Sequence, residues 1–368
     1  MTKINILKNY PKTKIILFTI LTLIISLVIF FYWFKSILPV NYNPEALKGS
    51  QPQDLIYLQQ GVKEQRGKIL AVVTSTDIMG SSGKSTGYEL TELARAYYVF
   101  KANGFEVDVA SPKGGKPPVV IDADDMGKFD YAFLNDEVAQ NKVDNSIAIA
   151  NVDSSQYEAV YFVGGKGAMF DFPENLSIKS IVSEYYQSGK VVGAVCHGPA
   201  ALVNVTLDDG SPLLANKTVT SFTNDEELLL IPNAKEIFPF LLQSKLEEQG
   251  AKFDAGHIYL EKVIQDGKLV TGQNPWSVWA VAESMVEQLG YTPIARQITA
   301  EENTISILNT YEDKGYQQAK AQIKSMQAKQ KDSVHRILLA MHSIVSVMQF
   351  EFGKSYDLLG LLASADND

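Results

Sequence analysis

The sequence predicts an α/β fold in which a mainly parallel sheet carries helices on both faces. Short, uninterrupted apolar runs such as 69–74 and 191–195 are typical of strands that are buried on both faces. Segments with helical periodicity, such as 88–103 and 278–289, follow such runs along the chain. Because strands that alternate with helices form parallel connections, this order predicts an α/β domain.

The individual elements can be placed in order. Strands are expected at 69–74, 105–110, 159–163 and 191–195, and helices at 88–103, 178–187, 238–248 and 278–289. Asp266-Gly267 is typical of a tight hairpin. In a parallel sheet the functional site lies at the carboxyl ends of the strands. The turns after Thr74, Val163 and Val195 are therefore the places where we expect the chemistry.

The composition limits the classes of function. The chain has 368 residues, enough for one large or two ordinary domains, and its net charge of −9 argues against binding to nucleic acid. A single cysteine excludes an intrachain disulfide. The four histidines and this cysteine lack the spacing of metal ligands, so neither a metal nor another cofactor is expected.

The N-terminal region predicts a membrane anchor. Residues 15–34 form an uncharged, almost wholly apolar run with the length of a transmembrane helix. Four lysines precede this run and one follows it closely, so residues 1–14 are expected in the cytoplasm and the rest of the chain outside it. A cleaved signal peptide is the alternative, but its apolar region is usually only about 7–15 residues long. We expect a single-pass anchor in the lipid bilayer, followed by a linker at 35–66.

Residues 293–368 extend beyond the predicted α/β domain at 67–292. The stretch 300–331 is polar and helix-prone, and 333–352 carries apolar residues at helical spacing: Ile337, Leu338, Met341, Ile344, Val345 and Met348. A helical extension packed on the domain or on another subunit is expected, because amphipathic helices usually bury one face. A helix lying on the membrane surface is the alternative.

Cys196 is the most informative residue. It ends the apolar run 191–195 and is followed by His197-Gly198-Pro199, which predicts a strand, a sharp turn and a helix with a thiol at the turn. This is the layout of a nucleophile elbow, and a helix N-terminus there would stabilise a thiolate. A buried, inert cysteine is the alternative. His197 could move a proton or could serve only as a cap.

Two other segments offer chemistry near this turn. Gly164-Gly165-Lys166-Gly167 follows a predicted strand, and its backbone N–H groups could form an oxyanion hole, or it could be a plain turn. Glu89 and Glu92 lie near one face of a predicted helix, and Asp225, Glu226 and Glu227 form a second acidic group. Each could be an ordinary acid in a first helical turn. Periodicity does not choose among them.

The segment 194–200, Ala-Val-Cys-His-Gly-Pro-Ala, resembles the nucleophile elbow of the PfpI/ThiJ family in the class I glutamine amidotransferase-like superfamily. Four more segments agree in order and spacing, at 85–87, 104–108, 164–173 and 269–275, and resemble the branch of stress-response chaperones and glyoxalase III enzymes. The resemblance implies a flavodoxin-like, doubly wound fold over roughly residues 67–292.

The resemblance also implies roles for particular residues. Cys196 matches the nucleophile, His197 its neighbour, Glu92 the acid that contacts the sulfur, and Glu227 the partner of the histidine. The backbone of Gly165 and of His197 matches the oxyanion donors, with Gly164 and Lys166 beside the substrate. Lys166 stands where the glyoxalase branch usually has a histidine.

The activity implied is a glyoxalase III-like lyase that converts methylglyoxal, a small aldehyde, to lactate without glutathione. A non-enzymatic chaperone and a cysteine peptidase or amidase of the same fold are the alternatives. A homodimer is compatible with this family resemblance, and the sequence alone does not determine the oligomeric state.

Overall fold

The computed structural model describes residues 16–22, 24–25, 28, 32, 44–123, 126–330 and 333–365. Its contacts divide the chain into two compact units. One, here called the α/β unit, spans Asn43–Asp313, and the other, here called the helical unit, comprises Lys314–Asp368 together with Met1–Tyr42. The α/β unit extends on both sides of the expected 67–292, and within the expected linker Leu55 and Tyr57 are buried in its core.

A seven-stranded sheet forms the centre of the α/β unit, in the order β10-β11-β7-β6-β1-β3-β5. All its neighbours pair in parallel except β10 and β11, which form the expected hairpin. The prediction of a mainly parallel sheet is thus confirmed. The strands are β1 Lys68–Val72, β3 Glu106–Ser111, β5 Ile147–Ala148, β6 Ala159–Phe162, β7 Val191–Val195, β10 Val263–Asp266 and β11 Leu269–Gly272, and two small pairs lie outside this sheet, β2 Tyr88–Glu89 with β4 Val119–Val120 and β8 Thr218–Val219 with β9 Lys252–Phe253.

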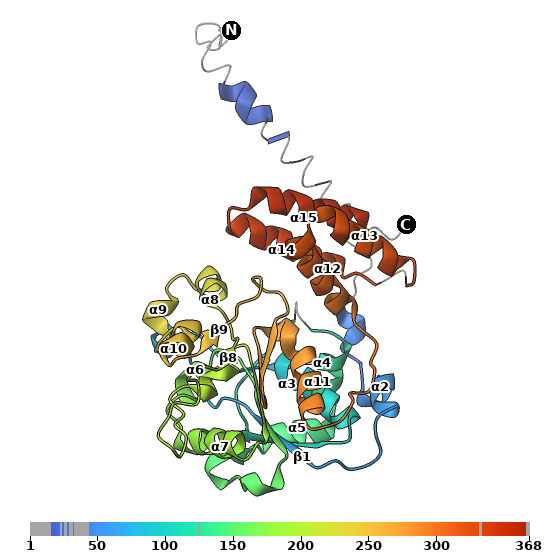
Figure 1. Ribbon diagram of the computed structural model, residues 1–368. Helices are drawn as coiled ribbons and strands as arrows, with labels where there is room; N and C mark the ends of the chain where they lie inside the picture. Colours follow the sequence, from blue (N-terminus) through green and yellow to red (C-terminus); the bar gives the residue numbers. More distant parts are fainter. Residues whose placement is uncertain are drawn as a thin grey trace, which may run out of the picture. The chain divides into compact units, whose positions relative to one another are not determined.

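Helices cover both faces of this sheet, as Figure 1 shows. One face carries α3 Leu90–Ala102, α4 Lys128–Leu134, α5 Glu137–Asp144 and α11 Val278–Gln288, and the other carries α6 Ala168–Asp171, α7 Leu176–Gln187 and α10 Leu242–Glu248. Alternation along β1 explains the two layers, since Ile69 and Ala71 enter one core while Leu70 and Val72 enter the other. The remaining helices of this unit are α2 Ile56–Gln59, α8 Asn224–Leu230, α9 Ala234–Ile237 and α12 Ala300–Lys314, and its 3₁₀ turns are Pro44–Leu47, Pro52–Asp54, Gly80–Ser82, Ile149–Asn151, Ser154–Gln156, Gly198–Leu202 and Pro275–Ser277.

Two helix starts differ from the sequence prediction. The helix expected from residue 88 begins at Leu90, because Tyr88 and Glu89 pair with Val119 and Val120 as β2 and β4. The helix expected directly after Cys196 is instead the five-residue 3₁₀ turn Gly198–Leu202. A turn this short has only a weak dipole to offer a thiolate, because the macrodipole grows from many aligned peptides.

The helical unit contains α13 Tyr316–Gln327, α14 Arg336–Met348 and α15 Phe352–Ser364 among its described residues. The expected polar helix over 300–331 is interrupted at Gly315, whose φ of 85° ends α12 before α13 begins. α14 packs against α15 and buries Leu338 and Leu339. The burial expected along its apolar stripe is only partly observed, since Met341, Ile344 and Met348 lie exposed on the opposite side.

The predicted anchor at 15–34 lies partly outside the described residues. Those of its residues that are described are helical, and large apolar side chains such as Ile16 and Phe18 are exposed there. Among the described residues no helix combines the length and the apolar character needed to cross a membrane.

Candidate functional site

Cys196 lies directly after β7 in the sharp turn predicted from the sequence. Its φ is 58°, a left-handed conformation that costs energy for any residue with a side chain. Two hydrogen bonds hold this strained backbone: the Cys196 N–H donates to the Gly272 carbonyl at 2.9 Å, and the Cys196 carbonyl accepts from the Phe222 N–H at 2.9 Å. The thiol therefore projects from a backbone that is fixed on both sides.

The thiol, an imidazole and a carboxylate form a continuous chain. Cys196 Sγ lies 3.3 Å from His197 Nδ1, and His197 Nε2 lies 2.6 Å from Glu227 Oε2. Burial alone would raise the pKa of Glu227, but the charge and hydrogen bond of His197 outweigh it and lower that pKa. An ionised Glu227 accepts the Nε2 proton of His197, which leaves Nδ1 free to accept a proton from the thiol.

Aromatic side chains hold the imidazole in this orientation. The His197 ring lies 4.7 Å from the ring of Phe222 and 6.3 Å from that of Phe238, centroid to centroid. Phe238 precedes α10, and Phe222 is the residue that also bonds the Cys196 carbonyl. The side chain of His197 is only 1% exposed, so bulk water does not compete for its two nitrogens.

Glu92 approaches the sulfur from α3. Its Oε2 accepts a hydrogen bond from the Gly164 N–H at 2.7 Å, and its backbone carbonyl accepts from the Tyr161 hydroxyl at 3.0 Å. Glu89, the other acid considered in this segment, instead donates its N–H to the Gly164 carbonyl. The structure thus brings Glu92 to the thiol, in agreement with the resemblance.

The pKa of Cys196 differs from the prediction. Burial raises it well above the ordinary value, the charge and hydrogen bond of Glu92 raise it further, and the positive charge of Lys166 opposes them. The thiolate that we expected at a helix N-terminus is therefore disfavoured in the resting protein. The main reason is burial of the sulfur, and the second is the charge of the Glu92 carboxylate beside it.

The turn after β6 lies against the cysteine. A Cβ built on Gly164 would lie 2.5 Å from Glu92 Oε2 and 2.8 Å from Cys196 Cβ, so only glycine fits there. Gly165 has a φ of 96°, which glycine adopts without strain. Within the described part of the chain, the N–H groups of Gly165 and His197 have no backbone partner, which is the condition for oxyanion donors.

Lys166 follows these glycines and is half-buried. Its positive charge acts on two buried groups of the site: it opposes the rise in the pKa of Cys196, and it contributes to lowering the pKa of Glu227. Its ammonium group has no hydrogen bond or ion pair with the residues that the structure describes.

Sequence reasoning named Glu226 only as one member of an acidic group, and it missed Tyr259. The buried carboxylate of Glu226 accepts five hydrogen bonds, from the N–H and hydroxyl of Thr223, the N–H of Tyr259 and the side-chain amides of Gln273 and Asn274. Tyr259 has a φ of 53° and also donates its hydroxyl to the Glu226 carbonyl at 2.7 Å. Both residues fix the start of α8, which carries Glu227. The Thr223-x-x-Glu226 spacing is a capping box and could have identified Glu226 as structural.

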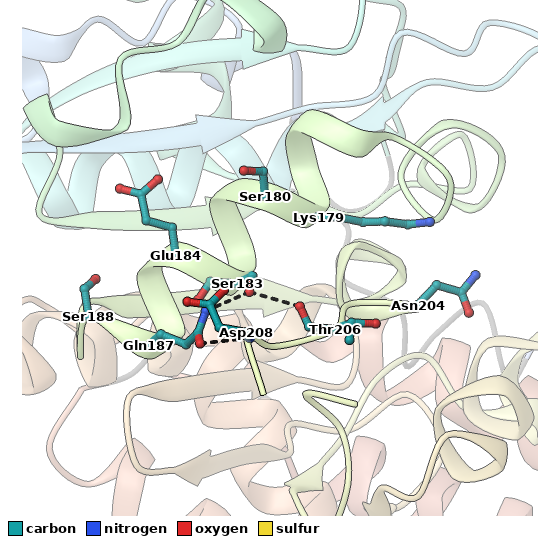
Figure 2. A pocket seen from close by; sticks show the side chains of 9 residues that line it. All are labelled: Lys179, Ser180, Ser183, Glu184, Gln187, Ser188, Asn204, Thr206 and Asp208. Carbon is teal, nitrogen blue, oxygen red and sulfur yellow. Dashed lines mark hydrogen bonds between the residues drawn. The ribbon is translucent and has the colours of Figure 1, made fainter. Parts of the chain in front are cut away.

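Other candidate sites are poorer. Among the described residues, no group of three or more His, Cys, Asp or Glu side chains could hold a metal ion. A depression of about 740 Å³ lies along α7, lined by residues of 179–188 and 204–208 (Figure 2), and none of the predicted site residues borders it. Its polar groups bond one another, as the Ser183 hydroxyl does with the Thr206 carbonyl at 3.1 Å.

Comparisons with known proteins identify the family of this chain. The model of the DJ-1/PfpI family matches residues 84–288. The chain is 31% identical over 235 residues to the glutathione-independent glyoxalase HSP31 of Saccharomyces cerevisiae, covering 60% of this chain and 97% of that protein.

Two solved structures resemble the α/β unit. The Rapid Encystment Protein 24 kDa of Francisella tularensis is 36% identical with a TM-score of 0.58, covering 61% of this chain and 99% of that one. Glyoxalase III from Candida albicans is 27% identical with a TM-score of 0.54, covering 60% of this chain and 97% of that one.

Proposed function

Because this chain belongs to the DJ-1/PfpI family, we propose that it is a cysteine-dependent, glyoxalase III-like enzyme that converts methylglyoxal to lactate without glutathione. The observation that carries the proposal is the chain of contacts from Cys196 Sγ through His197 to Glu227. It supplies a nucleophile, a base with a defined tautomer and a counter-charge. The relatives named as glutathione-independent glyoxalases support the choice of substrate.

In the first step the sulfur bonds to the aldehyde carbon of methylglyoxal. The thiol proton passes to His197 Nδ1 and then to the former aldehyde oxygen, which gives a hemithioacetal. A raised thiol pKa suits this order, because the proton leaves only when the electrophile is in place. The N–H groups of Gly165 and His197 stabilise the developing oxyanion, which is worth roughly 3–4 kcal/mol per donor in known enzymes.

In the second step the C–H proton of the former aldehyde carbon moves to the neighbouring carbonyl carbon, and the hydroxyl proton of the hemithioacetal moves to the oxygen of that carbonyl. The first carbon is oxidised to a thioester and the second is reduced to an alcohol, so no external oxidant or reductant is required. Glu92 and His197 are the proton carriers, because both contact the sulfur. Water then cleaves the thioester to release lactate and the free thiol.

The test is direct. The purified full-length chain in detergent should form lactate from methylglyoxal in the absence of glutathione, and the variant Cys196→Ala should form none above the buffer rate. Because Cys196 is the only cysteine, no other thiol can replace it. Equal lactate formation by both proteins would refute the proposal.

We also propose that residues 15–34 anchor the enzyme in a membrane, with residues 1–14 in the cytoplasm and the α/β unit outside it. The support comes from the sequence, in the uncharged length of this run and the lysines before it. We expect the chain to stay in the membrane fraction during alkaline carbonate extraction, and a chain that lacks residues 1–34 to be released. Protease should cleave the α/β unit of spheroplasts from outside, and its protection in intact spheroplasts would contradict the orientation.

A further inference from the structure

Every acid at this site is engaged by a partner inside the protein. Glu227 bonds His197, Glu92 bonds the Gly164 N–H, and Glu226 accepts five donors. Their negative charges are therefore already stabilised by neighbouring dipoles or by the imidazole.

Lys166 differs from these acids. Its ammonium group has no ion pair or hydrogen bond with the described residues, whereas that of Lys179 lies 2.9 Å from the Glu174 carboxylate. Parallel pairing of β6 with β7, with Phe162 opposite Ala194, places the turn that carries Lys166 beside the turn that carries Cys196. A Cβ built on Gly164 would lie 2.8 Å from the Cβ of Cys196, so the two turns pack directly against each other.

A half-buried cation beside a nucleophile attracts an anion more strongly than a fully solvated one does, because fewer waters screen it. The negatively charged group cannot be the aldehyde, because the aldehyde carbon is uncharged and must reach the sulfur. It must be a second group of the same substrate, within reach of the long lysine side chain.

We propose that Lys166 makes this site selective for 2-oxoaldehydes that carry a carboxylate, over neutral ones such as methylglyoxal. This inference rests on the proposed function, because it assumes the same reaction at Cys196. The carboxylate pairs with the Lys166 ammonium while the aldehyde carbon bonds the sulfur. For 4,5-dioxopentanoate the reaction adds one water, oxidises the aldehyde carbon, reduces the ketone carbon and gives 2-hydroxyglutarate.

The experiment compares 4,5-dioxopentanoate with its neutral methyl ester on the full-length chain in detergent at low ionic strength. We expect kcat/KM for the carboxylate to exceed that for the ester by about tenfold, as for one partly screened charge pair. Lys166→Met should bring this ratio close to one, Lys166→Arg should restore it, and the control Lys179→Met should leave it unchanged. Raising the salt to 0.5 M should reduce the wild-type ratio.

The outcomes separate the two proposals. Turnover of both substrates with a ratio near one, or a ratio that Lys166→Met does not change, overturns the selectivity and leaves the enzyme assignment intact. If neither substrate is consumed, the rate at which iodoacetamide alkylates Cys196 still reports whether a dicarboxylate binds at the site. Protection by 2-hydroxyglutarate that Lys166→Met abolishes supports the anion site, and equal alkylation with and without it refutes that site.

Discussion

Replacing Glu227 by Gln removes the charge that orients His197 while keeping the side-chain size. Glu227 Oε2 lies 2.6 Å from His197 Nε2, and its other oxygen, Oε1, is buried without a hydrogen-bond partner among the described residues. In one orientation the Gln amide donates to Nε2 and moves the ring proton to Nδ1, which then cannot accept the thiol proton. In the other, the amide NH₂ is buried at the former position of Oε1 without a partner.

The loss of kcat/KM in Glu227→Gln can be estimated from the hydrogen bond between His197 and Glu227 that is lost. A hydrogen bond to a charged group contributes about 1.5–3 kcal/mol, and here it stabilises the imidazolium that forms when the thiol gives up its proton. At about 1.4 kcal/mol per tenfold, kcat/KM should fall by about 10- to 150-fold. The fall should be larger if the amide selects the wrong tautomer, because loss of tautomer control in a related triad costs about 10⁴-fold.

The assay is lactate formation from methylglyoxal by Glu227→Gln beside Asp225→Asn. Asp225 lies in the same first turn of α8 but is exposed, so its variant makes the same change of charge without touching His197. Asp225→Asn should retain wild-type kcat/KM within about twofold, as expected for an exposed residue. A Glu227→Gln enzyme within threefold of wild type, with Cys196 still required, would refute the triad reasoning.

Two further predictions follow from shifted pKa values. Glu92→Gln removes a charge that raises the pKa of Cys196, so the pKa of the thiol should fall and iodoacetamide should alkylate it faster at pH 7.5. The alkylation rate can be followed against pH by mass spectrometry. An unchanged profile would show that Glu92 does not act on the sulfur. Burial lowers the pKa of His342 from 6.5 to about 4, so the folded helical unit excludes a proton that the unfolded chain binds below pH 6.5. The free energy of unfolding of this unit should be highest above pH 6.5 and fall by about 3 kcal/mol toward pH 4. Urea titrations followed by circular dichroism should show a smaller fall for His342→Gln.

Much of the fold could be predicted because it depends on local pattern. The runs at 69–74, 159–163 and 191–195 became β1, β6 and β7 with small changes at their ends, since continuous apolar segments of this length rarely form anything else in an alternating chain. Tyr88 and Glu89 were expected in a helix but form β2. Their strand partner, β4, is distant in sequence, and backbone hydrogen bonds to it determine their conformation.

The site was predictable only in part, for a similar reason. The turn at Cys196 could be inferred from adjacent residues, whereas the choice of Glu92 over Glu89 depends on which carboxylate reaches a glycine 72 residues away. Phe222 and Phe238 pack against the imidazole from separate loops, Tyr259 packs against Phe222 from a third, and no periodicity links them. The raised pKa of the thiol was missed because burial by the tertiary fold outweighs the local turn.

The two hydrogen bonds at the Cys196 backbone have a consequence for motion. Phe222, which bonds the Cys196 carbonyl, directly precedes Thr223, the N-cap of the helix that carries Glu227. A displacement of that loop therefore displaces the nucleophile and the acid together, and His197 with them, because its ring lies against Phe222. We therefore expect thermal fluctuation at this edge of the sheet to be correlated across the three groups, so that their mutual distances vary less than their positions do.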